Sequence, residues 1–354
     1  MKRVPIESLR QYCETSLQKV GLSAEDAGVA SEALITADSW GVFTHGTKLL
    51  SGYVRRLHGG GWKVAGRPRI ERQGPGWAIV HGDDALGQIG GEFAMRVAME
   101  KARVVGIAYV GLRETAHIGA AGYFASLAAR DGLIGIVMGN DMPSVAVPNS
   151  RTAVLGSNPL AYGIPSGSHD PILLDMATAA VAGGKVYAAH QRGEPIPDTW
   201  LIGPDGRPTS DGSLYPHQAA LAPMAGHKGY GLGLLCEVFA GLLSGGTITW
   251  EIGSWIFDAP AKSSRHNAGF LAIDVNTIAP REEFLARVDK LIDEIHNAPK
   301  ATGVDRIYVP GEMEWERRRV AQREGIALPA DVRAKLSELT EVAGYSPDWL
   351  ASST

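Results

Sequence analysis

The chain has 354 residues, a formal net charge of −4 and 20% charged residues. This length suggests about two domains, and the charge balance gives no sign of a nucleic-acid or membrane-surface partner. Cys13 and Cys236 are the only cysteines, too few and too far apart in sequence for a disulfide framework or a zinc cluster. The N-terminus has no apolar stretch of signal-peptide length, so we expect a soluble cytoplasmic protein.

The first 72 residues are predicted to form a helical region. Ser23 precedes apolar residues at helical spacing, with Asp26 three positions later, as in a capping box. A second helix is predicted over residues 48–57, before a run of three glycines. We expect this region to pack with helices of the C-terminal residues 312–354.

Residues 73–311 are predicted to form an α/β region that binds cofactor and substrate, because short apolar runs alternate with helical stretches. Residues 195–215, rich in Pro, Gly, Asp and Ser, are predicted to form a loop. Buried strands are predicted over residues 78–80, 107–110, 134–138, 172–174 and 270–273, and helices over residues 91–104, 121–131, 228–243 and 282–297.

His117 is the leading candidate for catalysis. It follows a predicted strand and precedes small residues that open a helix, a junction where side chains face a cleft and free helix N–H groups attract anions. An ordinary pKa near ~6.5 lets an imidazole accept or donate a proton at neutral pH. His45 lies in a similar setting, between Thr44 and Gly46. Two such histidines suggest acid–base chemistry on a small molecule.

Other junctions offer groups that suit a phosphate-containing cofactor. Lys228 opens a predicted helix of small residues, where helix N–H groups and an ammonium group together favour a phosphate. Asp141 and Asp175 lie at the ends of predicted strands, and the tight turn 309–312 ends in a carboxylate. No G-x-G-x-x-G sequence follows a predicted strand and opens a helix, so a Rossmann site is not supported.

Six segments of the chain have sequences that occur together, in the same order, in one protein family. They are residues 38–53, 116–123, 155–162, 175–178 with 184–186, 227–231 and 309–312. In these segments, and over nearly its whole length, the chain resembles the malate/L-lactate dehydrogenase type 2 family of NAD(P)-dependent oxidoreductases.

The resemblance implies hydride transfer between NAD or NADP and a small 2-hydroxy acid or 2-oxo acid, of the malate, lactate or ureidoglycolate type. It also implies a non-Rossmann cofactor-binding fold and a homodimer or an assembly of dimers, with the active site near a subunit boundary. His117 matches a proton acceptor and His45 a proton donor of family members, while Thr44 and Tyr53 match positions of the substrate pocket. The positions that match cofactor-holding segments are Asp141, Asp175, Met176, Ala177, Lys228, Pro310, Gly311 and Glu312.

One departure from the family concerns the substrate. Leu49 stands where the family usually has an arginine, a residue well suited to clamp a carboxylate. Lys48, about 100° away around the helix, is the substrate-binding candidate that could replace it after a local shift, and Arg113 is another. If neither does, the substrate differs from the usual 2-oxo acid. We expect poor activity with malate and lactate.

Two alternative functions stay open at this point. One is NAD(P)H-dependent reduction of the C=N bond of a cyclic imino acid, which only substrate trials separate from a dehydrogenase. The other is a non-catalytic dinucleotide-binding protein, although the presence of both His45 and His117 argues against it. The sequence does not distinguish NAD from NADP. For the proton transfer we favour His117, with His45 orienting the substrate oxygen.

Overall fold

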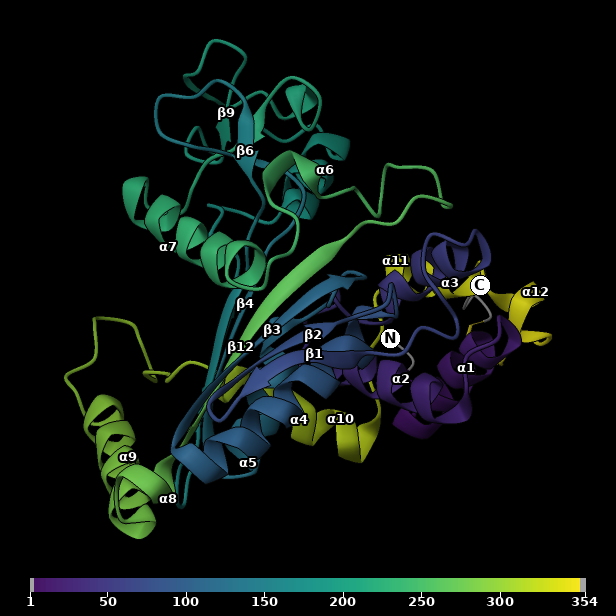
Figure 1. The fold of residues 1–354 in the computed structure, drawn as a ribbon. Coiled ribbons are helices and arrows are strands. Elements are labelled where there is room, and N and C mark those ends of the chain that lie inside the picture. The colour runs from purple at the N-terminus through teal and green to yellow at the C-terminus, as the bar shows by residue number, and fades with distance from the viewer. Residues whose placement is uncertain (1–2, 351–354) are drawn as a thin grey trace.

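A seven-stranded sheet forms the centre of the computed structural model, which describes residues 3–350 (Figure 1). Its strand order is β1-β2-β3-β12-β4-β7-β8, and only the β2–β3 pair is parallel. The five predicted strands are confirmed within it. The strands are β1 (Arg69–Gly74), β2 (Trp77–His81), β3 (Ile107–Thr115), β4 (Leu133–Gly139), β7 (Leu160–Ile164), β8 (Ile172–Met176) and β12 (His266–Asp274).

Helices α4 (Gly87–Val105) and α5 (Ala121–Arg130) cover one face of this sheet. Their apolar side chains and those of the strands form the main core, in which the rings of Phe124 and Phe270 meet edge to face at 5.7 Å. Helix α5 lies very close to the sheet, because a Cβ atom at Gly163 would be 2.5 Å from the carbonyl oxygen of Ala125. This close approach fixes α5, and therefore the segment that joins β3 to it.

The N-terminal and C-terminal helices pack together beside the sheet (Figure 1). Ser23 caps α2 by accepting a hydrogen bond from the backbone N–H of Asp26 at 3.1 Å, which confirms the predicted helix start. Val4 pairs with Ile326, so the two ends of the chain are tied to each other. The helices are α1 (Ile6–Lys19), α2 (Ala24–Ser39), η1 (Thr47–Leu49), α3 (Leu50–His58), α10 (Glu312–Glu324), α11 (Ala330–Ser337) and α12 (Thr340–Ala343).

A second lobe is built on a small sheet of order β10-β9-β11-β5-β6, with helix α6 (Gly183–Gln191) against it. The predicted loop over residues 195–215 is wrong in part. It contains two very short strands around a Gly-Pro-Asp-Gly turn, and the buried Leu201 anchors them. The strands are β5 (Val145–Ala146), β6 (Ala153–Leu155), β9 (Leu201–Ile202), β10 (Pro208–Thr209) and β11 (Ala220–Leu221), and η2 (Gly212–Leu214) follows β10.

The remaining helices follow in chain order. The predicted helix over residues 228–243 is α7 (His227–Glu237), which continues as a wider helical turn, η3 (Val238–Leu242). Short helices η4 (Thr249–Glu251) and α8 (Val275–Ile278) follow, and α9 (Arg281–His296) lies at the lower left in Figure 1, to the side of the sheet's lower end. Within residues 3–350, no helix is both long and apolar enough to cross a membrane.

Candidate active site

A cleft of about 930 Å³ contains most of the residues expected to act in catalysis and binding. It is lined by residues of the N-terminal helices, the central sheet, the second lobe and the C-terminal helices, so its lining is not confined to residues 73–311. The expected residues that line it are Thr44, His45, Lys48, His117, Asp141, Asp175, Met176, Ala177, Pro310 and Gly311.

His117 lies between the end of β3 and the start of α5 and faces this cleft. Its Nδ1 atom is 2.8 Å from the hydroxyl of Tyr53, which is fully buried. Because Nδ1 is engaged behind the cleft wall, Nε2 is the ring nitrogen left to face a ligand. Burial, with the neighbouring His266 and His45, lowers the pKa of His117 to about 3, so the imidazole is neutral at neutral pH.

His45 faces the same cleft from the segment between α2 and η1. Its ring centroid is 5.9 Å from that of His117, and its Nδ1 atom is 3.0 Å from the hydroxyl of Thr44. Burial lowers the pKa of His45, although Asp175 and Asp141 oppose this effect. The cleft therefore holds two neutral imidazoles side by side, each able to accept a proton.

Two further residues at His117 were missed by the sequence analysis. The indole of Trp255 stacks on the His117 ring with centroids 5.1 Å apart and planes inclined by 22°. His266, the first residue of β12, lies edge-on to His117 at 5.7 Å. Its position at the end of a strand is the same signal that singled out His117. Trp255 lies in an irregular segment without any periodic pattern, so nothing in its sequence context marks it.

Asp141 is held by its neighbours as a carboxylate. Its Oδ1 atom accepts hydrogen bonds from the backbone N–H of Met142 at 2.8 Å and from Nε2 of His266 at 3.0 Å. Burial would raise the pKa of Asp141, but the interactions with His266, with His117 and with the backbone N–H of Met142 together offset it, and the pKa is lowered. The negatively charged Asp141 can therefore stabilise His117 when the imidazole becomes protonated.

Asp175 connects the end of β8 to the start of α5. Its carboxylate accepts a hydrogen bond from the backbone N–H of Gly122 at 2.8 Å, in the first turn of that helix. A Cβ atom at Gly122 would lie 2.8 Å from the Cβ of Asp175, so only glycine permits this contact. Burial raises the pKa of Asp175 despite this hydrogen bond. The side chain both supports the helix next to His117 and lines the cleft.

The cations proposed as substitutes for the family arginine have other partners. Lys48 lines the cleft, but its ammonium group is 2.7 Å from the carboxylate of Asp331 on α11. Arg113 pairs with Glu71 at 2.8 Å and does not line the cleft, so the expectation that it could bind the substrate is wrong. Leu49 itself lines the cleft and leaves an apolar wall at this position.

Three expected site residues, Tyr53, Lys228 and Glu312, lie outside the cleft. Tyr53 does not line it, because its whole side chain is buried behind His117, where its hydroxyl contacts the imidazole. Lys228 is exposed at the start of α7. The lysine that lies in the cleft at the start of a helix is instead Lys185 of α6, with Gly183 and Gly184.

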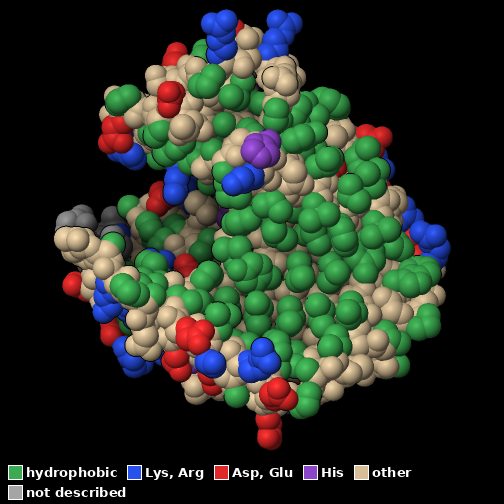
Figure 2. Space-filling view, turned by 90° about the vertical axis from the view of Figure 1, so that its left-hand side faces the viewer, with side chains coloured by type: hydrophobic (Ala, Val, Ile, Leu, Met, Phe, Trp, Pro, Cys, Tyr) green, Lys and Arg blue, Asp and Glu red, His purple; other side chains and the backbone are tan. Residues whose placement is uncertain are grey.

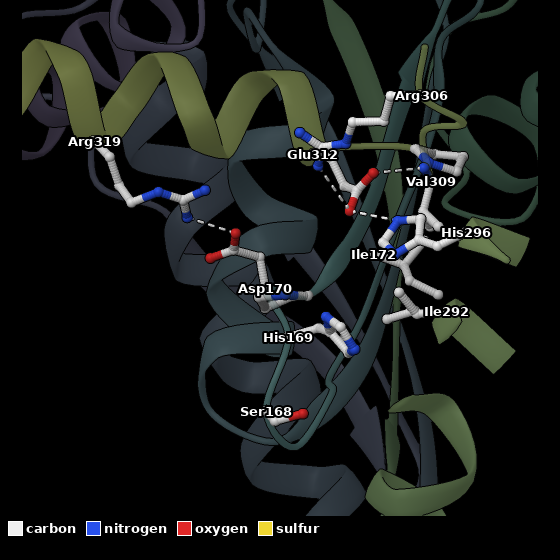
Figure 3. Close-up of a pocket in the computed structure, with 12 residues that line it drawn as sticks. Ser168, His169, Asp170, Ile172, Ile292, His296, Arg306, Val309, Glu312 and Arg319 are labelled. Atoms are coloured by element: carbon white, nitrogen blue, oxygen red, sulfur yellow. Dashed lines mark hydrogen bonds and ion pairs between the residues drawn. The ribbon is translucent and has the colours of Figure 1, made fainter. Parts of the chain in front are cut away.

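Glu312 points into a second, smaller cavity of about 380 Å³ (Figure 3). Its carboxylate accepts a hydrogen bond from the backbone N–H of Val309 at 2.9 Å and lies 2.8 Å from Nε2 of His296 and 3.5 Å from the guanidinium of Arg306. Arg319 in the same cavity is paired with Asp170 at 2.5 Å. This cavity is lined by charges that compensate one another.

The described part of the chain, residues 3–350, contains no group of three or more His, Cys, Asp or Glu side chains arranged to hold a metal ion.

Residues 4–337 match the malate/L-lactate dehydrogenase family model. The chain belongs to the malate/L-lactate dehydrogenase family. It is 37% identical to a malate dehydrogenase of Pyrococcus abyssi over 97% of this chain and 95% of that one, and 35% identical to an NAD(+)-dependent ureidoglycolate dehydrogenase of Escherichia coli O157:H7 over 93% of each. The solved structure of malate dehydrogenase from Pyrococcus horikoshii is 34% identical, with a TM-score of 0.87 over 97% of this chain and 96% of that one. As a member of this family the protein is an oxidoreductase.

Proposed function

We propose that the protein transfers a hydride between NAD or NADP and the carbon of a 2-hydroxy acid or 2-oxo acid bound beside His117. The observation that carries this proposal is the pair of neutral imidazoles, 5.9 Å apart, that face one cleft in a dehydrogenase family. Relatives named as malate and ureidoglycolate dehydrogenases support the substrate class.

The cleft has the groups that a nicotinamide dinucleotide needs. The first turn of α6, with Gly183, Gly184 and Lys185, presents helix N–H groups and a positive charge that suit the pyrophosphate. Met176 and Ala177, with the turn at Pro310 and Gly311, supply apolar and backbone surface to the same cleft. A Cβ atom at Gly311 would lie 2.7 Å from Leu173, so this turn packs tightly against β8. When bound there, the cofactor supplies the hydride-carrying ring. The sheet behind it is mixed, which agrees with a non-Rossmann site.

In the oxidising direction, His117 removes the proton of the substrate hydroxyl while the carbon loses its hydride. The tautomer suited to this role donates its Nδ1–H to Tyr53, which leaves the Nε2 lone pair facing the cleft. The imidazolium that forms is stabilised by the carboxylate of Asp141, which raises the pKa of His117 against the effect of burial. In the reducing direction the same Nε2 returns the proton to the developing alkoxide.

His45 has the complementary role of orienting the substrate oxygen. Its Nδ1 is hydrogen-bonded to Thr44, so Nε2 is available to the ligand. Because burial keeps His45 neutral, it donates a hydrogen bond without adding a charge to the cleft. The two histidines together hold one oxygen between a donor and a base.

We also propose a homodimer. The sheet face opposite α4 and α5 carries apolar side chains such as Ile134, Ile136 and Leu271, which are only half-buried. Figure 2 shows hydrophobic side chains gathered over a broad area of one side of the molecule. An exposed apolar area of this kind marks an interaction surface. Light scattering coupled to gel filtration tests the proposal, and a monomer at micromolar concentration would contradict it.

The activity is tested by following reduced-nicotinamide absorbance with NADH and with NADPH, against a panel of 2-oxo acids and cyclic imino acids. Turnover of at least one 2-oxo acid supports the proposal, and the ratio of the two cofactors' kcat/KM values assigns NAD or NADP. Turnover of imines alone would replace the proposed function with imine reduction. Tight cofactor binding without turnover would instead indicate a binding protein.

A further inference from the structure

Four residues of η1 and α3 lie on one helical stripe that faces the active site. Leu49, Gly52, Tyr53 and Arg56 follow the spacing i, i+3, i+4, i+7, which places them on the same side of a helix. Leu49 and Gly52 line the cleft, and Tyr53 contacts His117. Arg56, at the end of this stripe, is 1% exposed.

Arg56 holds the loop 254–262 through its backbone. All three guanidinium nitrogens donate hydrogen bonds to carbonyl oxygens of the loop, at 2.5 to 2.9 Å, and the side chain forms no ion pair among residues 3–350. Five such bonds from one rigid, planar group fix the path of the loop. The accepting carbonyls belong to Ser254, Trp255, Asp258, Ala259 and Lys262.

The fixed loop places Trp255 flat on His117. A Cβ atom at Gly52 would be 2.9 Å from the Trp255 ring, so the indole lies directly against α3. The edge of Tyr53 meets the same ring at 5.4 Å. Trp255 is therefore held by contacts with Gly52 and Tyr53 while its ring stacks on the imidazole. In this position it shields one face of His117 from water.

The next two loop residues extend this wall into the cleft as apolar surface. Ile256 and Phe257 line the cleft and are 52% and 55% exposed. Leu49 lies one helical turn before Gly52, on the same side. The nearby Lys48 is already paired with Asp331. Arg55 also lines the cleft and forms no ion pair among the described residues. Its single positive charge can bind one substrate carboxylate rather than two.

We propose that the loop 254–262, positioned by Arg56, forms the side-chain pocket of the substrate and selects a 2-oxo acid with one carboxylate and a bulky apolar side chain. This inference rests on the proposed function. The side chain of such a substrate covers Ile256 and Phe257 and gains the free energy of their removal from water. A dicarboxylic substrate would have to place its second charge against the same apolar wall.

The test compares phenylpyruvate with oxaloacetate as substrates for the reduced cofactor. We expect kcat/KM for phenylpyruvate to exceed that for oxaloacetate by at least about tenfold. A preference for oxaloacetate would overturn the inference and leave the proposed function intact. If neither acid nor any other 2-oxo acid is reduced, the proposed function fails and this inference fails with it.

Phe257→Ser localises the effect, because the residue is exposed and its replacement does not disturb the core. We expect kcat/KM for phenylpyruvate to fall about tenfold, mainly through KM, with little change for oxaloacetate. Ile278→Ser removes an apolar side chain of similar exposure, 60%, outside the cleft and should change neither value. An equal loss for both substrates, or a change in oligomeric state with an unchanged substrate ratio, would overturn the proposal.

Arg56→Lys tests the positioning role, since lysine keeps the charge but cannot reach five carbonyls. We expect NADH binding to persist while phenylpyruvate KM rises and kcat falls. Water admitted beside Trp255 should also raise the pKa of His117, which moves the acidic limb of the kcat/KM profile to higher pH. Suppose instead that the variant loses stability but keeps the pH profile and the ratio of kcat/KM for phenylpyruvate to that for oxaloacetate. Arg56 would then have only a structural role.

Discussion

The candidate active-site cleft and the smaller cavity both contain histidine and charged side chains but differ in how these groups are paired. In the smaller cavity, His296, Arg306 and Arg319 each lie close to a carboxylate (Figure 3). In the cleft, no carboxylate of residues 3–350 contacts His45 or His117, and burial lowers their pKa values. The difference teaches that a buried histidine without a contacting carboxylate is a better candidate for proton transfer than a histidine paired with one.

The largest expected effect comes from His117→Ala. Loss of the proton acceptor should lower kcat by at least about a hundredfold, while cofactor binding persists because the substituted side chain is not among the proposed cofactor contacts. Steady-state rates and a fluorescence titration with NADH measure the two effects. His296→Ala, in the smaller cavity, is the matched control and should retain nearly full kcat. A near-normal rate for His117→Ala would transfer the proton role to His45.

Tyr53→Phe sharpens the comparison by removing only the hydroxyl behind His117. We expect kcat to fall about tenfold with little change in KM, because one buried hydrogen bond that orients the imidazole is lost. Tyr12→Phe removes another buried hydroxyl, which donates to the carbonyl of Leu336; neither residue lines the cleft, so kcat should stay unchanged. Equal kcat values for the two variants would contradict a positioning role for Tyr53.

Asp38 provides a pH-dependent test close to the His45 segment. Burial raises the pKa of this carboxyl to about 7, although Thr47 donates two hydrogen bonds to it. A raised folded-state pKa means that stability is highest below the unfolded pKa and is lost as pH rises through 7. Urea denaturation between pH 5 and 8 should show this loss in the native protein but not in Asp38→Asn. The same slope in both proteins would exclude Asp38 as its source.

The smallest effect is expected for Glu312→Gln. The variant loses the ion pairs with His296 and Arg306, which are partly exposed and contribute less than about 1 kcal/mol to the free energy of unfolding. The KM for NADH should stay unchanged if the side chain acts only in the smaller cavity. A rise of several-fold in that KM would show that Glu312 contacts the cofactor, as its sequence motif predicts.

The sequence predicts most of the regular elements, because they rest on local patterns. The apolar runs of the central strands and the Ser23 cap are examples. It also singles out His45 and His117, which the structure brings together in one cleft. It does not reveal Trp255, because this residue belongs to the irregular loop 254–262, whose position depends on hydrogen bonds from the distant Arg56. The direction of the Glu312 side chain also depends on contacts with α9, more than ten residues earlier in the chain.

The cleft could be predicted only in part for the same reason. Lys228 and Lys185 both open helices of small residues, and their local sequences do not say which of the two helices points into the cleft. Tyr53 matches a pocket position, but whether it touches the substrate depends on how deeply α3 is buried. Such questions concern the packing of whole elements, which periodicity alone does not specify.

The most direct test of the central claim is a crystal structure with the reduced cofactor and an unreactive 2-oxo acid analogue. We expect the nicotinamide ring in the cleft and the analogue's 2-oxo oxygen, or the atom that replaces it, within about 3 Å of Nε2 of His117. Ligands bound in the smaller cavity, or a substrate oxygen beyond the reach of both His117 and His45, would contradict the account.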